Sequence, residues 1–199
     1  KVYDMNRRIL VRLFLTAAII ILIWATLTVW VEKNGPAKIW HFANAGSQKL
    51  LVVYDPDPIY NLDQQICQSL GRGVSSNNNI DVTIATVAAS KDLDLDSFDS
   101  FVICANTYNW MPDWATSRFV RSTKALNHKR VAAITLGAGS TVHSQKALEK
   151  MIEETGGELI ESQSLWLLRP NDDAQMEKGN VQVALAKAYY IGKHLQLNN

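Results

Sequence analysis

The chain has 199 residues, with 20 Lys and Arg against 19 Asp and Glu and a formal net charge of +1. This length predicts one domain of ordinary size with an appendage. Because the basic residues are spread along the chain, they form no stripe for a phosphate backbone, and we expect no nucleic acid partner. The two cysteines, Cys67 and Cys104, are too few and too far apart for a zinc or iron–sulfur ligand set.

The N-terminal part contains an uncharged apolar run over residues 13–31, LFLTAAIIILIWATLTVWV. At a rise of about 1.5 Å per residue, about 19 residues cover the roughly 30 Å of bilayer hydrocarbon, so the run predicts a transmembrane helix. A secretory signal peptide has a shorter apolar core, about 7 to 15 residues, that ends in small residues. This run ends in Trp30 and Glu32, which favours an uncleaved anchor over a signal peptide or a buried helix.

The basic residues around this run predict its orientation. They lie mostly on its N-terminal side, with Lys1, Arg7, Arg8 and Arg12 before it and Lys33 and Lys38 after it. The positive-inside bias then predicts a single-pass membrane protein whose residues 1–12 are cytoplasmic and whose soluble domain is extracytoplasmic.

Residues 32–48 are expected to form a juxtamembrane linker, because Gly35, Pro36 and Gly46 punctuate the segment. Two interpretations are open for the aromatic Trp40 and Phe42 between them. They form either an interfacial patch at the bilayer or a contact with the folded domain.

Residues 49–199 alternate strand and helix patterns. Continuous apolar runs, typical of strands buried on both faces of a parallel sheet, are KLLVVYD from Lys49, IDVTIATV from Ile80, SFVICAN from Ser100, RVAAITLGAG from Arg130 and GELIESQSLWLL from Gly157. Helical periods separate these runs, and a last helix is expected over about residues 173–197. The alternation predicts right-handed crossovers and an α/β, doubly wound, five-stranded parallel sheet. Ligands of such sheets bind beyond the carboxyl ends of the strands, here at residues 55–61, 106–110 and 137–140.

Three stretches within residues 49–168 resemble the flavodoxin-like family: KLLVVYDPDP, FDSFVICANTYNWMPDWATSRFV and LGAGSTVHSQKALEKMIEETGGELIES. The resemblance implies the strand order 2-1-3-4-5 and an FMN site made by loops at the strand ends. It places two sets of residues around the flavin ring, Asn106, Thr107, Tyr108, Asn109 and Trp110 after one strand, and Gly137, Ala138, Gly139 and Ser140 after the next.

The first loop, residues 55–61, departs from the family's phosphate-binding pattern of Ser, Thr and Gly. Pro56 and Pro58 have no N–H to donate, and Asp55 and Asp57 add negative charge beside a phosphate dianion. Asn61 is the one side chain left there that resembles an anion donor. Ordinary FMN binding is therefore not expected.

Other chemistry finds little support in the sequence. The histidines show no paired spacing, the hydrolase motif G-x-S-x-G is absent, and we expect neither catalytic residues nor a metal site. Asp55 and Asp57 could bind a divalent cation, but residues of this type beside prolines more commonly form a turn, and we expect a turn here. We expect Cys67 and Cys104 to be two separate buried thiols, although an oxidising compartment would permit a disulfide between them.

These observations leave two functional hypotheses. The first is an accessory or structural subunit of a membrane protein complex, whose flavodoxin-like domain contacts partner proteins. The alternative is a membrane-tethered electron-transfer protein or flavin-dependent reductase that binds FMN through the two ring loops.

Overall fold

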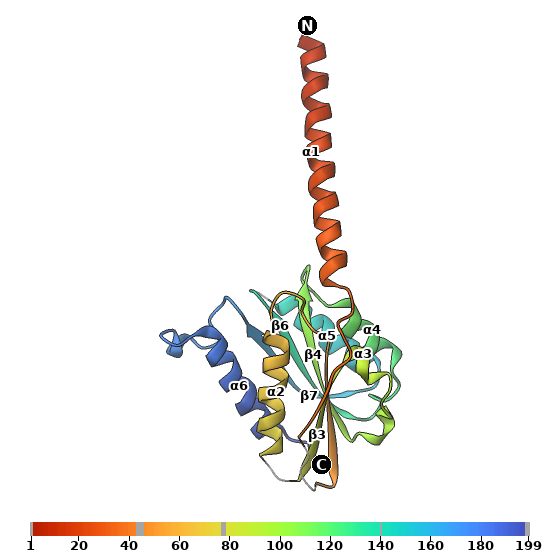
Figure 1. Cartoon of the computed structure of the whole chain (residues 1–199), viewed down its shortest axis with the longest axis vertical. Helices are drawn as coiled ribbons and strands as arrows, with labels where there is room; N and C mark the ends of the chain where they lie inside the picture. The colour runs from red at the N-terminus through yellow and green to blue at the C-terminus, as the bar shows by residue number, and fades with distance from the viewer. Residues whose placement is uncertain (1, 43–45, 77–78, 140, 198–199) are drawn as a thin grey trace. The chain divides into compact units, whose positions relative to one another are not determined.

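The computed structural model describes residues 2–42, 46–76, 79–139 and 141–197, and the chain divides into two compact units, Lys1–Lys33 and Asn34–Asn199. The first unit is a single helix, α1 (Val2–Val31; Figure 1). Its residues Arg7–Val31 are long and apolar enough to cross a membrane. Apolar side chains such as Phe14 and Leu22 are exposed along it, 73% and 67% respectively.

The second unit contains a mostly parallel sheet in the order β1-β3-β2-β4-β6-β7. Its parallel strands are β2 (Gln48–Tyr54), β3 (Ile80–Thr86), β4 (Ser100–Tyr108), β6 (Arg130–Gly137) and β7 (Glu158–Trp166). Numbered among themselves, these strands have the order 2-1-3-4-5, which confirms the predicted flavodoxin-like sheet.

Two short antiparallel strands extend the predicted sheet. β1 (Ile39–Phe42) pairs with β3 within the segment expected to be a linker, and β5 (Met111–Pro112) folds back on β4. The aromatic side chains of β1, Trp40 and Phe42, pack against the core, where Trp40 lies 6.2 Å from the ring of Tyr54. The second interpretation of these aromatics is therefore the right one, and β1 covers an edge of β3 that would otherwise be open.

Helices cover both faces of the sheet (Figure 1). On one face lie α2 (Leu62–Ser75) and α6 (Asn180–His194), and on the other lie α3 (Val87–Ser90), α4 (Trp114–Ser122) and α5 (Val142–Glu154). Two 3-10 turns, η1 (Leu95–Ser97) and η2 (Asp173–Gln175), complete the elements.

The last helix is shorter than predicted, because the segment before it is held by side chains. The Asn180 amide donates hydrogen bonds to the carbonyls of Trp166, Leu167 and Arg169, and this ties residues 166–169 to the start of α6. Only the 3-10 turn η2 forms within the expected first turn of the helix.

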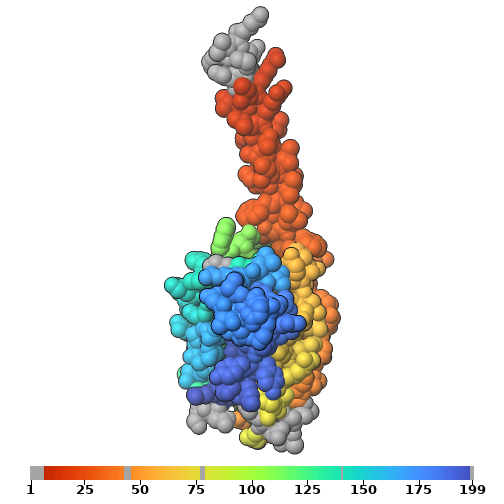
Figure 2. All heavy atoms as spheres, turned by 90° about the vertical axis from the view of Figure 1, so that its left-hand side faces the viewer, coloured from red at the N-terminus to blue at the C-terminus, as the bar shows by residue number. Residues whose placement is uncertain are grey.

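The core consists of two apolar layers, one on each face of the sheet. Successive residues of β2 alternate between them, so that Leu50 and Val52 face α2 and α6 while Leu51 and Val53 face the other helices. This explains the continuous apolar sequence of the strand. Figure 2 shows α6, in blue, packed beside α2, in yellow. A Cβ atom on Gly192 would lie 2.1 Å from the carbonyl oxygen of Leu70, so the two helices approach each other at a glycine.

Candidate functional site

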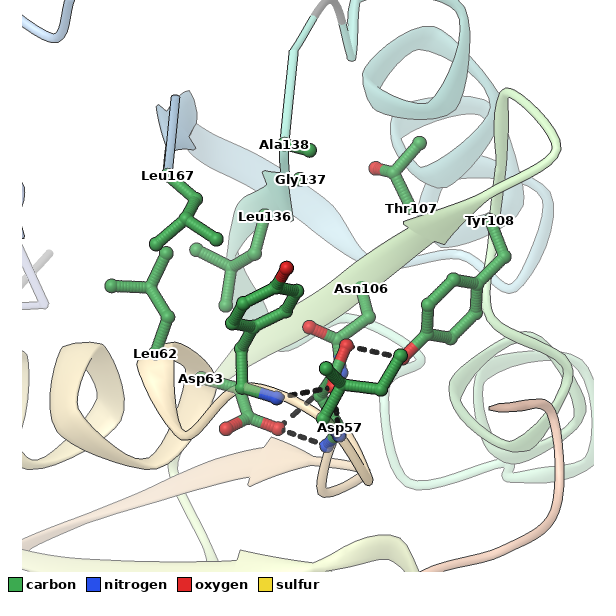
Figure 3. Close-up of a pocket in the computed structure, with 12 residues that line it drawn as sticks. Asp57, Leu62, Asp63, Asn106, Thr107, Tyr108, Leu136, Gly137, Ala138 and Leu167 are labelled. Atoms are coloured by element: carbon green, nitrogen blue, oxygen red, sulfur yellow. Dashed lines mark hydrogen bonds between the residues drawn. The ribbon is translucent and has the colours of Figure 1, made fainter. Parts of the chain in front are cut away.

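The loop between β2 and α2, residues 55–61, folds around the side chain of Asp57, and we call it the Asp57 loop. The Asp57 carboxylate accepts hydrogen bonds from the backbone N–H groups of Ile59 at 2.6 Å and Tyr60 at 2.7 Å. Its second oxygen accepts one from the hydroxyl of Tyr108, on β4, at 2.6 Å (Figure 3). Successive backbone N–H groups that converge in this way form an anion-binding site, and here the anion is the loop's own carboxylate.

A second carboxylate, that of Asp63 in the first turn of α2, accepts hydrogen bonds from two further backbone N–H groups nearby. It accepts from the backbone N–H of Asp57 at 2.5 Å and of Gln64 at 2.6 Å. The N–H groups of residues 57, 59, 60 and 64 are thus engaged internally, and Pro56 and Pro58 have none to offer.

Asn106 joins this loop to the middle of the sheet. Its side-chain amide donates to the carbonyl oxygen of Asp55 at 2.8 Å and to the carboxylate of Asp63 at 3.3 Å. Its own backbone N–H donates to Asp113, the N-cap residue of α4, at 2.9 Å. Asn106 is 8% exposed, so its amide serves the protein's own loop.

Three carboxyl groups around Asn106 are buried. Burial raises the pKa of Asp55 to about 6, although the N–H of Gly35 and the charge of Arg118 lower it. Burial also raises the pKa of Asp63 to about 6 and that of Asp113 to about 7, against the lowering effect of their hydrogen bonds. These carboxyls therefore gain negative charge around Asn106 as the pH rises through the range of about 6 to 7.

The loop after β4 is a two-residue hairpin that presents Trp110 to solvent. β5 pairs Met111 with Tyr108, and the residues between them, Asn109 and Trp110, have φ values of 49° and 63°. Two consecutive positive φ values are typical of a type I′ turn, which is unusual for tryptophan. Trp110 is 70% exposed and does not line the pocket described below.

The loop after β6 packs tightly against its neighbours. A Cβ atom on Gly137 would lie 2.7 Å from the methyl carbon of Thr141 and 3.3 Å from Cβ of Thr107, which explains the glycine. The carbonyls of Gly137 and Ala138 accept hydrogen bonds from the N–H groups of Leu167 and Leu168 after β7, at 2.9 and 3.1 Å. This loop is therefore closed on one side by the chain that follows β7.

Between the three loops lies a pocket of about 160 Å³ (Figure 3). Its lining is mostly apolar, with Asp57, Asp63 and Asn106 on one side, and comprises Asp57, Ile59, Tyr60, Leu62, Asp63, Asn106, Thr107, Tyr108, Leu136, Gly137, Ala138 and Leu167. Pockets for drug-sized ligands and cofactors measure about 300 to 1,000 Å³. The pocket is partly open to solvent, and the volume inside it is below this range.

The structure brings together part of the residue set expected from the sequence. Asn106, Thr107, Tyr108, Gly137 and Ala138 line the pocket, Asn61, Asn109, Trp110 and Gly139 do not, and Ser140 lies outside the described residues. The lining residues Asp57, Ile59 and Tyr60 lie in the loop 55–61, which the sequence placed at the ligand-binding edge without assigning them to the site, whereas Leu62, Asp63, Leu136 and Leu167 were not predicted. Position at the strand ends signalled Ile59 and Tyr60, whereas Leu167 lies just after β7, a strand that the sequence did not link to the site.

The fit of this site to a flavin phosphate is poor. Two unit charges 4 Å apart interact by about 4 kcal/mol at an effective dielectric constant of about 20, and Asp57 holds such a charge among the donors that a phosphate would need. Within the described residues, no three His, Cys, Asp or Glu side chains are grouped to hold a metal ion. Cys67 and Cys104 are both buried as free thiols, in contact with each other.

Comparisons with known proteins identify the fold. No protein-family model matches the sequence, and no curated protein matches it. Among solved structures, two-electron reduced flavodoxin from Megasphaera elsdenii is 14% identical, with 70% of this chain and 98% of that chain covered and a TM-score of 0.52.

Two reductases are similar to the same extent. The NAD(P)H:quinone oxidoreductase from Methanothermobacter marburgensis is 8% identical, with 76% of this chain and 100% of that chain covered and a TM-score of 0.54. An NADH:FMN oxidoreductase (EMOB) in its apo form is 13% identical, with 77% and 91% covered and a TM-score of 0.55. The chain therefore has the flavodoxin-like α/β fold.

Proposed function

We propose that this chain is a membrane-anchored accessory subunit whose flavodoxin-like domain contacts partner proteins. We further propose that the first loop of this domain does not bind the phosphate of FMN. One observation carries the proposal: the Asp57 carboxylate accepts from the donors of Ile59 and Tyr60, at the place where a flavodoxin-like domain binds phosphate. Phosphate entry would require this carboxylate to leave three short hydrogen bonds. Charge-assisted hydrogen bonds contribute about 1.5 to 3 kcal/mol each, so that exchange is costly.

The anchor supports the membrane part of the proposal. A helix of the length and apolarity of Arg7–Val31 needs apolar surroundings, which a bilayer supplies. The excess of basic residues before it favours an extracytoplasmic domain. A tether also raises the effective concentration of the domain near membrane partners to the millimolar range, roughly, so weak contacts suffice.

The first test is a spectrum and a titration on the full chain in detergent. We expect no flavin absorbance after purification and no quenching of FMN fluorescence at concentrations of about 100 μM or below. In native membranes, the chain should migrate in an assembly with defined co-purifying proteins, whose amounts fall when the chain is deleted. A bound flavin, or a chain that migrates alone in mild detergent, would contradict the proposal.

A second candidate is a tethered FMN-binding electron-transfer protein or reductase. The observation that favours it is the aromatic Tyr60 beside Tyr108 and Gly137 in the pocket lining, where an isoalloxazine ring would contact aromatic and small residues. This candidate requires the Asp57 loop to open. It predicts saturable FMN binding and a reduction potential shifted from that of free FMN, which the same titration and a redox titration would detect.

A further inference from the structure

Exposed apolar side chains gather at one end of the folded domain. We call the end where the parallel strands finish the carboxyl edge. Loops and helix starts after β2, β4, β6 and β7 each bring exposed large apolar residues to it: Ile59, Tyr60, Trp110, Met111, Trp114, Val142 and Leu168. We call this set the edge patch. Among the described residues of this unit, the other exposed large apolar side chains are Ile39 at the start of β1, Met176, Tyr189 and Tyr190.

The chain enters the domain at this same edge. The side chain of Asn34 accepts a hydrogen bond from Arg118 of α4 at 2.8 Å, and the N–H of Gly35 donates to Asp55 at the end of β2 at 3.1 Å. The carbonyl of Pro36 then accepts from the hydroxyl of Thr86, the last residue of β3, at 3.0 Å. Residues 34–36 are therefore fixed along the carboxyl edge.

The distance from this entry point to the apolar helix is limited by the covalent chain. The helix ends at Val31, and each further residue extends the chain by at most about 3.6 Å, so Asn34 lies within about 11 Å of the helix end. If the helix spans a bilayer and ends near its surface, the same limit holds Asn34, where the chain joins the carboxyl edge, near that surface, and the edge patch is then within reach of the headgroup layer.

The residue types at this edge suit a lipid headgroup layer. Trp and Tyr concentrate at membrane interfaces, and apolar surfaces beside basic side chains bind there. Lys38, Arg118 and Arg169 are exposed at this edge, whereas the nearby carboxyls of Asp55 and Asp113 are buried. Asp57 is partly exposed, but both of its oxygens accept hydrogen bonds from the protein.

We propose that the edge patch rests on the lipid headgroup layer, with Trp110 and Trp114 inserted at the level of the headgroups. This inference rests on the proposed membrane anchor. The tether supplies an effective concentration on the order of millimolar, so a patch with a dissociation constant of about 1 mM is occupied about half of the time. The hairpin that presents Trp110 holds it in a left-handed conformation, which contributes nothing to the core but directs the indole outward.

Tryptophan quenching by brominated lipid tests this contact on the full chain. The reporter carries Trp24→Phe and Trp30→Phe, which remove the indoles of the helix, and is reconstituted into phosphatidylcholine nanodiscs brominated near the lipid carbonyls. We expect quenching that falls by at least about half when Trp110→Phe and Trp114→Phe are added. Tyr190→Trp, added to that variant at a position of similar exposure on α6, should not restore it; Tyr190 is 64% exposed and Trp110 70%.

The outcomes separate the two proposals. Co-migration of the chain with the nanodisc reports the anchor, independently of quenching. A chain that co-migrates but whose Trp110 and Trp114 are unquenched overturns the edge contact alone, and a chain that fails to co-migrate overturns the anchor and the contact with it. Shielding of both indoles from iodide in native membranes, without lipid quenching, would assign the patch to a protein partner and also overturn the inference.

Discussion

Replacing Asp57 by glycine removes the carboxylate that occupies the anion site of the first loop. Three donors, the N–H groups of Ile59 and Tyr60 and the hydroxyl of Tyr108, then lose their acceptor. A phosphate oxygen can take its place. We therefore expect the Asp57→Gly variant to bind FMN more tightly than the parent chain.

The magnitude follows from the charge removed. About 4 kcal/mol of repulsion for unit charges at 4 Å and an effective dielectric constant of about 20 corresponds to roughly 1,000-fold in dissociation constant. Ordering of the freed loop offsets part of this gain, so we expect at least about a 100-fold decrease in the dissociation constant.

The assay is an FMN fluorescence titration, with riboflavin as the ligand that lacks phosphate. Asp57→Asn removes the charge but keeps an acceptor oxygen, so it should show a smaller gain than Asp57→Gly. Asp92→Asn changes an exposed carboxylate in another loop and should leave binding unchanged. Equal FMN affinity in the parent and in Asp57→Gly, with both folded by circular dichroism, would refute the reasoning, and a gain for riboflavin equal to that for FMN would refute the role of phosphate.

Three further predictions concern stability, each measured by urea unfolding of the full chain in detergent. Burial raises the pKa of Asp113 from 3.8 to about 7, so between these values the folded chain holds a proton that the unfolded chain releases. The free energy of unfolding should therefore fall as the pH rises from about 4 to about 7, and the slope should be smaller in Asp113→Asn. A free energy of unfolding that rises over this range would contradict the buried carboxyl. Trp110→Gly should stabilise the fold by about 1 kcal/mol because it relieves a φ of 63° at an exposed side chain, whereas Trp114→Gly in the first turn of α4 should destabilise it by a similar amount. A lower free energy of unfolding in Trp110→Gly would indicate that the Trp110 indole is packed. Gly192→Ala should lower the free energy of unfolding by about 1 to 3 kcal/mol, because its Cβ would lie 2.1 Å from a backbone oxygen of α2. Gly139→Ala, whose Cβ would meet nothing within 4 Å, should lower it far less. Equal losses of stability in the two variants would refute the close approach of α2 and α6.

Much of the fold was predictable from local sequence. A strand buried on both faces has no polar alternation, so KLLVVYD and RVAAITLGAG indicate parallel strands by themselves. The edge strand β1 was not predictable, because IWHF is short and lies among linker-like residues. Its pairing depends on β3, which begins about 40 residues later in the chain.

The location of the candidate site was predictable, but the hydrogen bonds within its first loop were not. The amino-acid pattern alone indicates which loops meet at the carboxyl edge, because parallel strands end together, and it shows that Pro56 and Pro58 have no N–H to donate. The folded chain was needed to show that the Asp57 carboxylate turns back onto the N–H groups of its own loop, because that contact depends on the loop's path and on a tyrosine from β4. The same is true of the edge patch: its apolar residues lie far apart in sequence, and the sheet brings them to one end of the domain, where the chain from the apolar helix enters.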